Sequence, residues 1–233
     1  MLTNQDKEWL AQKYPGLKED HGVVSGTLEF TAAYNDKTNE FLIIEGGTSN
    51  TIGGTILNGR FEIIIKERID KSFSELPALC VKNIDTIPDR HINQSDKTAC
   101  LCNPLEEEEF LKPGFKFVDF FQRLVIPFLY GQEFFSLKNA WPWDEYAHGI
   151  VGILESYAKF YNSKKAGECI AKLKHDKTVW PYIKNALQRK SYIKGHTPCF
   201  CKEKDHIKRC HPIAWKGINL LKKDIEKEEL IID

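Results

Sequence analysis

The sequence lacks any run of about 18 uncharged apolar residues, which argues against a membrane-spanning helix. The longest apolar stretch, FKFVDFFQRLVIPFLYGQEFF at 115–135, is interrupted by Lys116, Asp119, Arg123 and Glu133. We therefore expect it to form a core helix. The N-terminus also lacks a basic patch followed by an apolar stretch, so we expect no secretion signal and a cytoplasmic protein.

Net charge is lacking too, because 33 Lys and Arg balance 33 Asp and Glu among 233 residues. The balance is uneven along the chain: residues 163–223 contain 16 Lys or Arg against 4 Asp or Glu. Such a segment suits a solvated lysine-rich surface, an acidic protein partner or nucleic acid. The 42% hydrophobic residues suffice for a packed core, which argues against disorder.

Nucleotide-binding signatures are absent as well. The glycine-rich stretch GGTSNTIGGT at 46–55 has no lysine of the phosphate-binding-loop kind, and it is typical of a hairpin turn. No Rossmann glycine signature occurs elsewhere. In a reducing cytoplasm, the seven cysteines are expected to be catalytic, metal-binding or buried rather than a disulfide framework.

The remaining pattern indicates an α+β chain. A short helix is expected before Tyr14-Pro15-Gly16, where proline and glycine stop it. Four β-rich runs separated by turn signals predict a four-stranded antiparallel meander, at 26–36, 39–47, 58–69 and 76–84. Asn103 is placed to cap a helix that starts at Pro104, and Glu106 to complete a capping box. Further helices are expected over 115–136, 142–162, 164–175, 178–192 and 213–229.

The most specific local pattern lies near the C-terminus. Four metal-ligand residue types follow the pattern C-x-C-x8-C-H, namely Cys199, Cys201, Cys210 and His211. Thiolates and imidazole favour tetrahedral zinc, so we predict a closed structural zinc site. The spacing resembles the SEC-C zinc knuckle, although Lys202 and Glu203 replace the usual Gly-Ser. His196 and His206 are near enough to compete as ligands, and we interpret them as surface residues.

A second candidate site is HINQSDKTACLCNP at 91–104. From the residues alone, its cysteines could be a nucleophile, metal ligands or packing thiols. If 100–102 is extended, Cys100 and Cys102 point to opposite sides, and we assign Cys100 to the open side. A metal site made of His91, Cys100 and Cys102 would have no evident fourth ligand.

The order of these features resembles the ubiquitin-conjugating enzyme (UBC) fold over residues 1–137. The resemblance rests on the helix ending in Tyr-Pro, the meander, Leu76-Pro77, IPDRHIN at 87–93 and ACLC at 99–102. It is most similar to the conjugating-enzyme homologues of CBASS antiphage operons, which also encode a nucleotidyltransferase of the cGAS and DncV-like type. Residues 138–233 would then be a helical extension carrying the knuckle at 199–211.

The resemblance implies a transferase of antiviral defence. Its Cys100 would receive the C-terminus of a partner, expected to be the cGAS/DncV-like nucleotidyltransferase, as a thioester and pass it to a target. Asn93 would orient or stabilise the oxyanion, and His91 begins the same motif, although Ile92 replaces the usual proline. The chemistry needs a thiolate, and one amide donor can contribute about 3 kcal/mol in acyl transfer. Because no adenylation motif is present, either a separate protein activates the carboxylate or the thioester forms by an exchange that the sequence does not disclose.

The helix expected from Pro104 would favour a thiolate through its dipole, whereas its four glutamates would oppose it. We therefore expect little activation of Cys100 at rest. Two other interpretations stay open. One is a UBC fold without catalysis that scaffolds a partner through the basic zinc-knuckle region. The other is nucleic-acid binding through the knuckle, which predicts that binding weakens steeply with salt. On the leading interpretation, the partner is a protein and not nucleic acid or a membrane.

Overall fold

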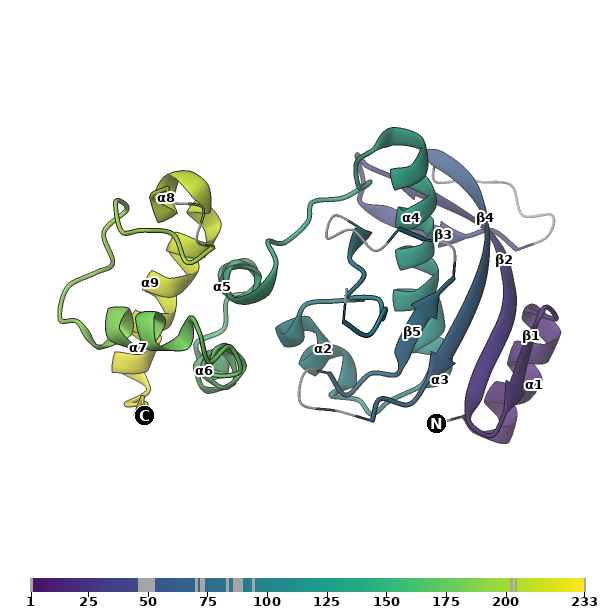
Figure 1. Cartoon of the computed structure of the whole chain (residues 1–233), viewed down its shortest axis with the longest axis horizontal. Helices are drawn as coiled ribbons and strands as arrows, with labels where there is room; N and C mark the ends of the chain where they lie inside the picture. Colours follow the sequence, from purple (N-terminus) through teal and green to yellow (C-terminus); the bar gives the residue numbers. More distant parts are fainter. Residues whose placement is uncertain are drawn as a thin grey trace. The chain divides into compact units, whose positions relative to one another are not determined.

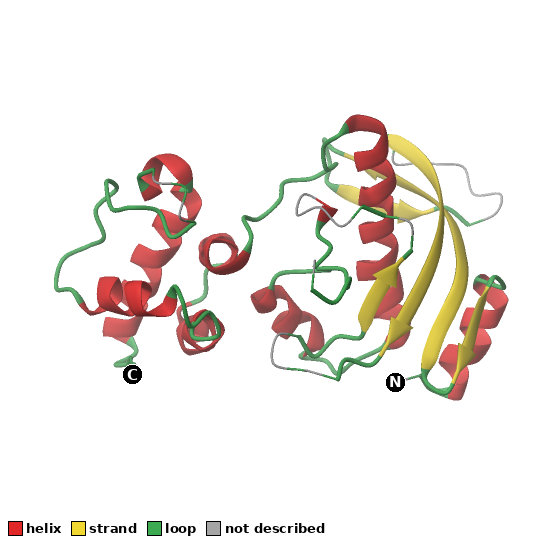
Figure 2. Cartoon of the chain, in the orientation of Figure 1, coloured by secondary structure: helices red, strands yellow, loops and turns green. Residues whose placement is uncertain are grey.

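The computed structural model describes residues 2–45, 53–69, 71, 74–82, 84–85, 90–93, 95–201, 203 and 205–232. They form an antiparallel sheet and a series of helices, which confirms the α+β class (Figures 1 and 2). Most of the stretch expected as a glycine-rich turn, 46–52, lies outside the described residues. None of the described helices combines the length and apolar content needed to span a bilayer.

The chain divides into two compact units. Unit 1 comprises Met1–Cys102 and Leu111–Glu145, and unit 2 comprises Asn103–Phe110 and Tyr146–Asp233. This division differs from a single boundary after residue 137 in two respects: residues 138–145 belong to unit 1, and residues 103–110 belong to unit 2. Both differences have a physical reason, given below.

Unit 1 is built on a five-stranded antiparallel sheet, with strands β1 (Leu17–Asp20), β2 (Val23–Asn35), β3 (Glu40–Ile43), β4 (Thr55–Lys66) and β5 (Ala78–Val81). The order is β1-β2-β4-β5, and β3 pairs with β2. β4 occupies one edge of β2 from Val24↔Ile65 to Tyr34↔Thr55. The two short strands β1 and β3 share the other edge, at opposite ends.

The expected meander is correct in three of its strands and wrong in the place of the fourth, β3. The run expected at 39–47 contains β3, which lies off the main path, and β1 takes the first place in the meander instead. Its sequence, LKED, has neither apolar alternation nor β-branched residues, so it gave no strand signal. It pairs because β2 is long enough to leave an unsatisfied edge beside it.

Helices complete unit 1. α1 (Asn4–Lys13) starts with a capping box in which Thr3 and Asp6 bond each other's backbone N–H groups. The helix expected over 115–136 is observed as α3 (Phe117–Phe120), a π-helical turn (Phe121–Val125) and α4 (Ile126–Lys138). Pro127 explains the π-helical turn, since its ring crowds the carbonyl four residues before it. The Ile126 N–H bonds the Phe121 carbonyl.

The segment after α4 is not helical, although a helix was expected from residue 142. α5 (Gly149–Lys159) begins at Gly149, whose φ of 63° lies in the left-handed region. Trp141 packs beside Phe128 and Phe135 of α4, with ring centroids 6.0 and 6.2 Å away. Trp143 packs beside Tyr34 of β2. These aromatic contacts keep residues 141–145 in unit 1.

Unit 2 is helical, with α2 (Pro104–Leu111), α5, a 3₁₀ turn (Ser163–Lys165), α6 (Ala166–Leu173), α7 (Trp180–Gln188), α8 (Ile207–Cys210) and α9 (Pro212–Lys227). α5 packs closely on α9: a Cβ on Gly217 would lie 1.9 Å from the Leu154 carbonyl oxygen. The core also holds Ile153, Leu173, Ile183, Ile218 and Leu221. The helices expected at 164–175, 178–192 and 213–229 correspond to α6, α7 and α9.

The capping box at the start of α2 is confirmed. Asn103 accepts a hydrogen bond from the Leu105 N–H at 3.1 Å, and its own N–H donates to the Glu106 carboxylate at 3.3 Å. The glutamates of α2 bind partners in unit 2 through the pairs Tyr146–Glu106, Lys172–Glu108 and Lys165–Glu109. These bonds explain why residues 103–110 cluster with the C-terminal helices.

A buried carboxylate joins α5 to α9. Asp224 accepts hydrogen bonds from the hydroxyls of Tyr157, at 2.6 Å, and Tyr161, at 2.8 Å. Tyr157 is buried, whereas Tyr161 is 46% exposed. Burial and the Asp224 carboxylate both raise the pKa of Tyr157, so this hydroxyl keeps its proton and remains a donor at neutral pH.

We predict that Tyr157→Phe lowers the free energy of unfolding of unit 2 by about 1–3 kcal/mol, because a buried acceptor loses its donor. Tyr161→Phe is the matched control and should cost less than about 1 kcal/mol, since water can reach that side of the carboxylate. Urea denaturation followed by circular dichroism measures both. Equal losses for the two variants would contradict the prediction.

Candidate active-site loop and metal centre

The cysteine loop is held beside β5 by backbone pairing. The Ala99 N–H donates to the Leu79 carbonyl at 2.7 Å, and Thr98 forms an antiparallel bridge with Cys80. On its other side, Ala99 forms an antiparallel bridge with Ile92. Residues 98–100 therefore lie between β5 and residues 91–93. The start of the expected motif, 87–89, lies outside the described residues.

Cys100 is the exposed residue of this short segment. Its N–H donates to the His91 carbonyl at 2.8 Å, which makes the two residues neighbours across the pairing. Thr98 and Ala99 are buried, Cys100 is exposed and Cys102 is half-buried. The backbone around the thiol is thus fixed, while the thiol itself is accessible to a second molecule.

Asn93 is held by a network that starts at Thr98, its neighbour across the pairing. The Asn93 amide Nδ2 donates to the Thr98 hydroxyl at 3.0 Å. That hydroxyl donates to the Asp96 carboxylate at 2.8 Å, and the Arg68 guanidinium lies 3.4 Å from the hydroxyl. A carboxylate only accepts, so the hydroxyl hydrogen points to Asp96 and its lone pair faces Asn93. The network therefore sets which way the amide faces.

Asp96 is the acceptor on which this orientation depends. Although burial acts to raise it, the pKa of Asp96 is lowered overall by the hydrogen bonds from Thr98 and by the charge of Arg68. The carboxylate is consequently ionised at neutral pH. Arg68 reaches the loop from the end of β4, with an Nη1 to Oδ2 distance of 3.8 Å to Asp96.

The His91 side chain is held by Trp141 and Glu145, which lie in the last segment of unit 1 in the sequence. Its Nε2 contacts the Glu145 carboxylate, and its ring meets the edge of Trp141 with centroids 5.0 Å apart. Its neighbour Arg90 donates to the buried Gln132, whose amide in turn donates to the Arg90 carbonyl at 2.7 Å. The loop is therefore tied both to β5 and to the region around α4.

Sequence reasoning singled out His91, Asn93 and Cys100 but not the residues that hold them. Asp96 and Thr98 form a local Asp-x-Thr turn that could have been recognised, because such side chains bond the backbone two residues on. Glu145 and Gln132 gave no signal, since they reach the loop only through the tertiary fold. Cys80 is a packing residue, and burial raises the pKa of its thiol.

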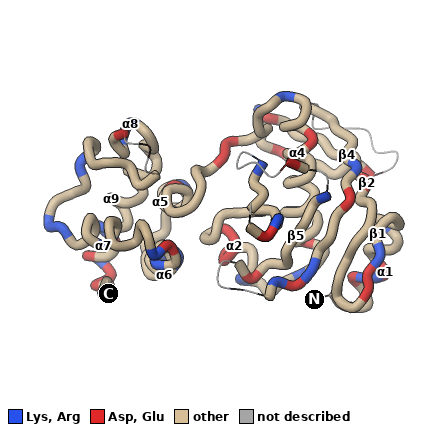
Figure 3. Tube along the Cα trace, viewed as in Figure 1, with Lys and Arg blue, Asp and Glu red and all other residues tan. Residues whose placement is uncertain are grey.

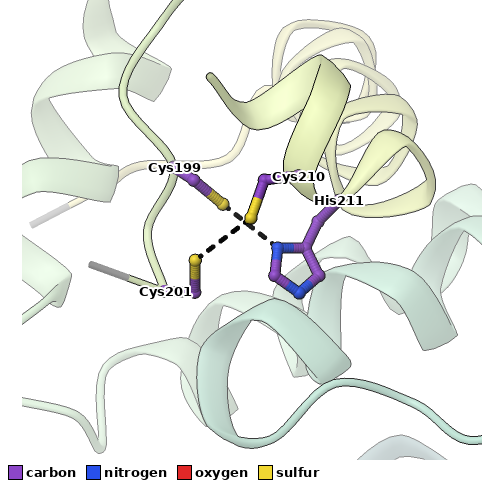
Figure 4. A group of neighbouring side chains, drawn as sticks. All are labelled: Cys199, Cys201, Cys210 and His211. Atoms are coloured by element: carbon purple, nitrogen blue, oxygen red, sulfur yellow. Dashed lines mark hydrogen bonds between the residues drawn. The ribbon is translucent and has the colours of Figure 1, made fainter. Parts of the chain in front are cut away.

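The four residues expected as zinc ligands are brought together in unit 2 (Figure 4). Their ligand atoms all lie within 4.8 Å of one another. The closest pairs are Cys199 Sγ to His211 Nδ1, at 3.2 Å, and Cys201 Sγ to Cys210 Sγ, at 3.5 Å. Around zinc, with Zn–S bonds of about 2.3 Å, neighbouring sulfurs of a tetrahedron are about 3.8 Å apart. The cluster can thus bind a metal ion after small side-chain adjustments.

Local backbone bonds shape this cluster. Pro198 bridges His206, and the Cys199 N–H donates to the Asp205 carbonyl at 2.8 Å, which closes the turn between the two halves of the pattern. α8 then carries Cys210 back toward Cys201. Lys202, one of the two departures from the SEC-C pattern, lies outside the described residues.

Cys199 and Cys210 favour the protonated form when no cation is near, because the pKa of each thiol is raised. Burial is the main cause that raises the pKa of Cys199. The hydrogen bond with Cys201 is the main cause that raises the pKa of Cys210 to about 12. A divalent cation reverses this preference, because it stabilises the thiolates directly. The donor set, two or more thiolates with one imidazole, suits zinc.

His196 and His206 lie beside the cluster, with ring centroids 6.4 Å apart, and both are exposed. Among the described residues, the group that could bind a metal ion contains neither. No protein-family model matches the chain, and no match was found among curated proteins or solved structures.

We predict that the purified protein contains about one zinc ion per chain and that Cys210→Ser loses most of it, measured by elemental mass spectrometry. Chelation should lower the thermal stability of the protein, because metal binding is coupled to folding of the knuckle. His206→Ala is the matched control and should retain zinc. Full zinc occupancy in Cys210→Ser would contradict the assignment.

Proposed function

We propose that this protein is a ubiquitin-conjugating-enzyme-like transferase that carries an acyl group as a thioester on Cys100. The observation that carries the proposal is an exposed thiol on a rigid backbone, between β5 and a segment that presents His91 and Asn93. The succession of α1 and the β1-β2-β4-β5 meander upstream supports a UBC-like arrangement. Zinc at the cluster of unit 2 would have a structural role, because four protein ligands leave no open position for chemistry.

The reaction proposed is transthiolation. The Cys100 thiolate attacks the carbonyl carbon of a C-terminal thioester held on an activating protein. A bond between carbon and the Cys100 sulfur forms, and the bond to the carrier sulfur breaks, so the carrier leaves as a thiolate and takes up the proton lost by Cys100. In a second step, an amine of the acceptor attacks the new thioester, Cys100 leaves as a thiolate and the amine loses a proton.

Asn93 is the group proposed to stabilise the oxyanion. Its Nδ2 carries two hydrogens, and Thr98 accepts one of them. The second hydrogen is then available to the carbonyl oxygen that becomes negative during attack. Thr98 and Asp96 act as positioning residues, since they orient the amide and do not themselves need to touch the substrate.

His91 is also a positioning residue in this proposal. Its Nε2 is engaged by Glu145 and its ring by Trp141, which suits a fixed support for the Cys100 N–H and not a mobile base. The protein whose C-terminus is transferred is proposed to be a cGAS/DncV-like nucleotidyltransferase, in antiviral defence. That identity rests on the family resemblance of the cysteine loop and on no contact in this structure.

We predict that Cys100 is the acylated residue. Incubation with the benzyl thioester of a peptide ending in glycine should add the peptide mass to the wild-type protein, and dithiothreitol should remove it. Cys100→Ala should abolish the adduct, Cys100→Ser should give an adduct stable to dithiothreitol, and Cys102→Ala should behave like the wild type. An adduct that persists in Cys100→Ala would refute the assignment.

A further prediction separates the oxyanion role of Asn93 from mere accessibility of the thiol. Asn93→Ala should slow acylation by roughly 100-fold, because one oxyanion donor is lost. Thr98→Val should slow it by about tenfold through a misoriented amide, and Thr98→Ser should restore the rate. Alkylation of Cys100 by iodoacetamide forms no oxyanion, so its rate should be unchanged in all three variants. Equal losses in both reactions would contradict the role proposed for Asn93.

A further inference from the structure

Unit 2 presents a cluster of exposed basic side chains around the segment that joins α7 to α8. The members of this basic face are Arg189, Lys190, Tyr192, Lys194 and Lys208, and all five are exposed. Figure 3 shows basic positions along this part of the tube. Among the described residues, no acidic side chain forms an ion pair with any of the four cations of the basic face. Arg209, which is not a member, pairs with Asp205. Their charge therefore faces solvent uncompensated.

The backbone beneath the basic face is anchored to α9. The ammonium group of Lys222, which is buried, donates to the carbonyls of Leu187, at 2.6 Å, and of Arg189. Four residues on, the Ile193 N–H donates to the Asn219 side chain at 2.9 Å, and the Ile193 carbonyl accepts from the Trp215 indole at 2.7 Å. These bonds leave the side chains between the anchors directed outward.

Helix α8 brings Lys208, the fourth cation of the basic face, next to the segment that carries Lys194. The Lys208 N–H donates to the Gly195 carbonyl at 3.1 Å, and the Lys208 ammonium lies 5.1 Å from the centre of the Trp215 ring. Trp215 in turn bonds Ile193, so Lys208 lies against the segment that carries Lys194. The basic face is thus formed by the segment between α7 and α8 and by α8 itself, and it is held in place by hydrogen bonds to side chains of α9 and not by its own charges.

We propose that the basic face binds single-stranded nucleic acid. Uncompensated cations suit phosphates, and acidic peptides would be attracted by the same charge. The feature that favours nucleic acid is Tyr192, whose ring is 67% exposed between Lys190 and Lys194. An exposed aromatic ring flanked by cations provides a stacking platform for a base, with the neighbouring phosphates on either side. A polyglutamate chain has no flat ring that could stack on Tyr192 as a base can.

Fluorescence anisotropy of the full chain with a labelled 20-nucleotide oligo(dT) or oligo(U), over a series of salt concentrations, tests the proposal. Affinity should fall with salt, with a slope of log K against log salt near −2.8 if four phosphates are contacted. Lys190→Ala/Lys194→Ala should make the slope shallower by about 1.4. Lys18→Ala/Lys37→Ala removes the same charge from exposed positions of unit 1 and should leave it unchanged.

The aromatic contribution is tested separately. Tyr192→Ala should weaken oligonucleotide binding by about tenfold, because a stacked base is lost. Tyr182→Ala is the matched control, since Tyr182 is 70% exposed on α7 and lies outside the basic face. Circular dichroism and zinc content confirm that each variant is folded. Absence of oligonucleotide binding, equal effects of the two tyrosine variants, or equally tight binding of a labelled polyglutamate peptide that ignores Tyr192 would each overturn the proposal.

Discussion

The arrangement of unit 1 depends on the pairing of β2 with β4. This ladder runs without interruption from Val24↔Ile65 to Tyr34↔Thr55. It buries Leu28, Ile63 and Ile65 on the face that α4 covers, and it leaves the far edge of β4 for β5. β5 is only four residues long, yet its Leu79 carbonyl is the acceptor for Ala99, next to Cys100. The position of the thiol is thus set by successive backbone pairings that begin at the longest strands.

Unit 2 uses buried polar groups of one helix for a similar purpose. α9 carries Lys222 and Asp224, which are both buried and both hydrogen-bonded to other segments. Lys222 holds the end of α7, and Asp224 holds Tyr157 of α5 and Tyr161 just after it. A buried charge is costly unless it is paired or fully hydrogen-bonded, so these side chains specify which segments α9 must meet. A metal ion bound by the Cys199, Cys201, Cys210 and His211 cluster, which ends at the start of α9, would further constrain this unit of short helices.

The sequence predicted these features unevenly. The clustering of Cys199, Cys201, Cys210 and His211 could be predicted because all four lie within one short segment, where spacing alone predicts proximity. The cap of α2 was identified for the same reason, since Asn103 and Glu106 act within one helical turn. By contrast, β1 has no strand pattern of its own, and it forms by pairing with β2 across the His21-Gly22 turn. The contact of Glu145 with His91 depends on the tertiary fold, which leaves no local pattern. Residues 142–148 were wrongly expected to be helical, because tryptophan packing on α4 outweighs a helical periodicity there.

Burial and neighbouring groups place the seven cysteines in distinct environments, which sequence position alone could not reveal. Cys169 is buried in the apolar core of unit 2 and Cys80 is half-buried on β5, and burial raises the pKa of both thiols. Three thiols and the His211 imidazole lie within 4.8 Å of one another, where together they could bind a metal ion. The remaining two belong to the loop beside β5, and of these Cys100 is exposed whereas Cys102 is half-buried. A reaction with a protein substrate requires an accessible thiol on a rigid backbone, and Cys100 combines both properties.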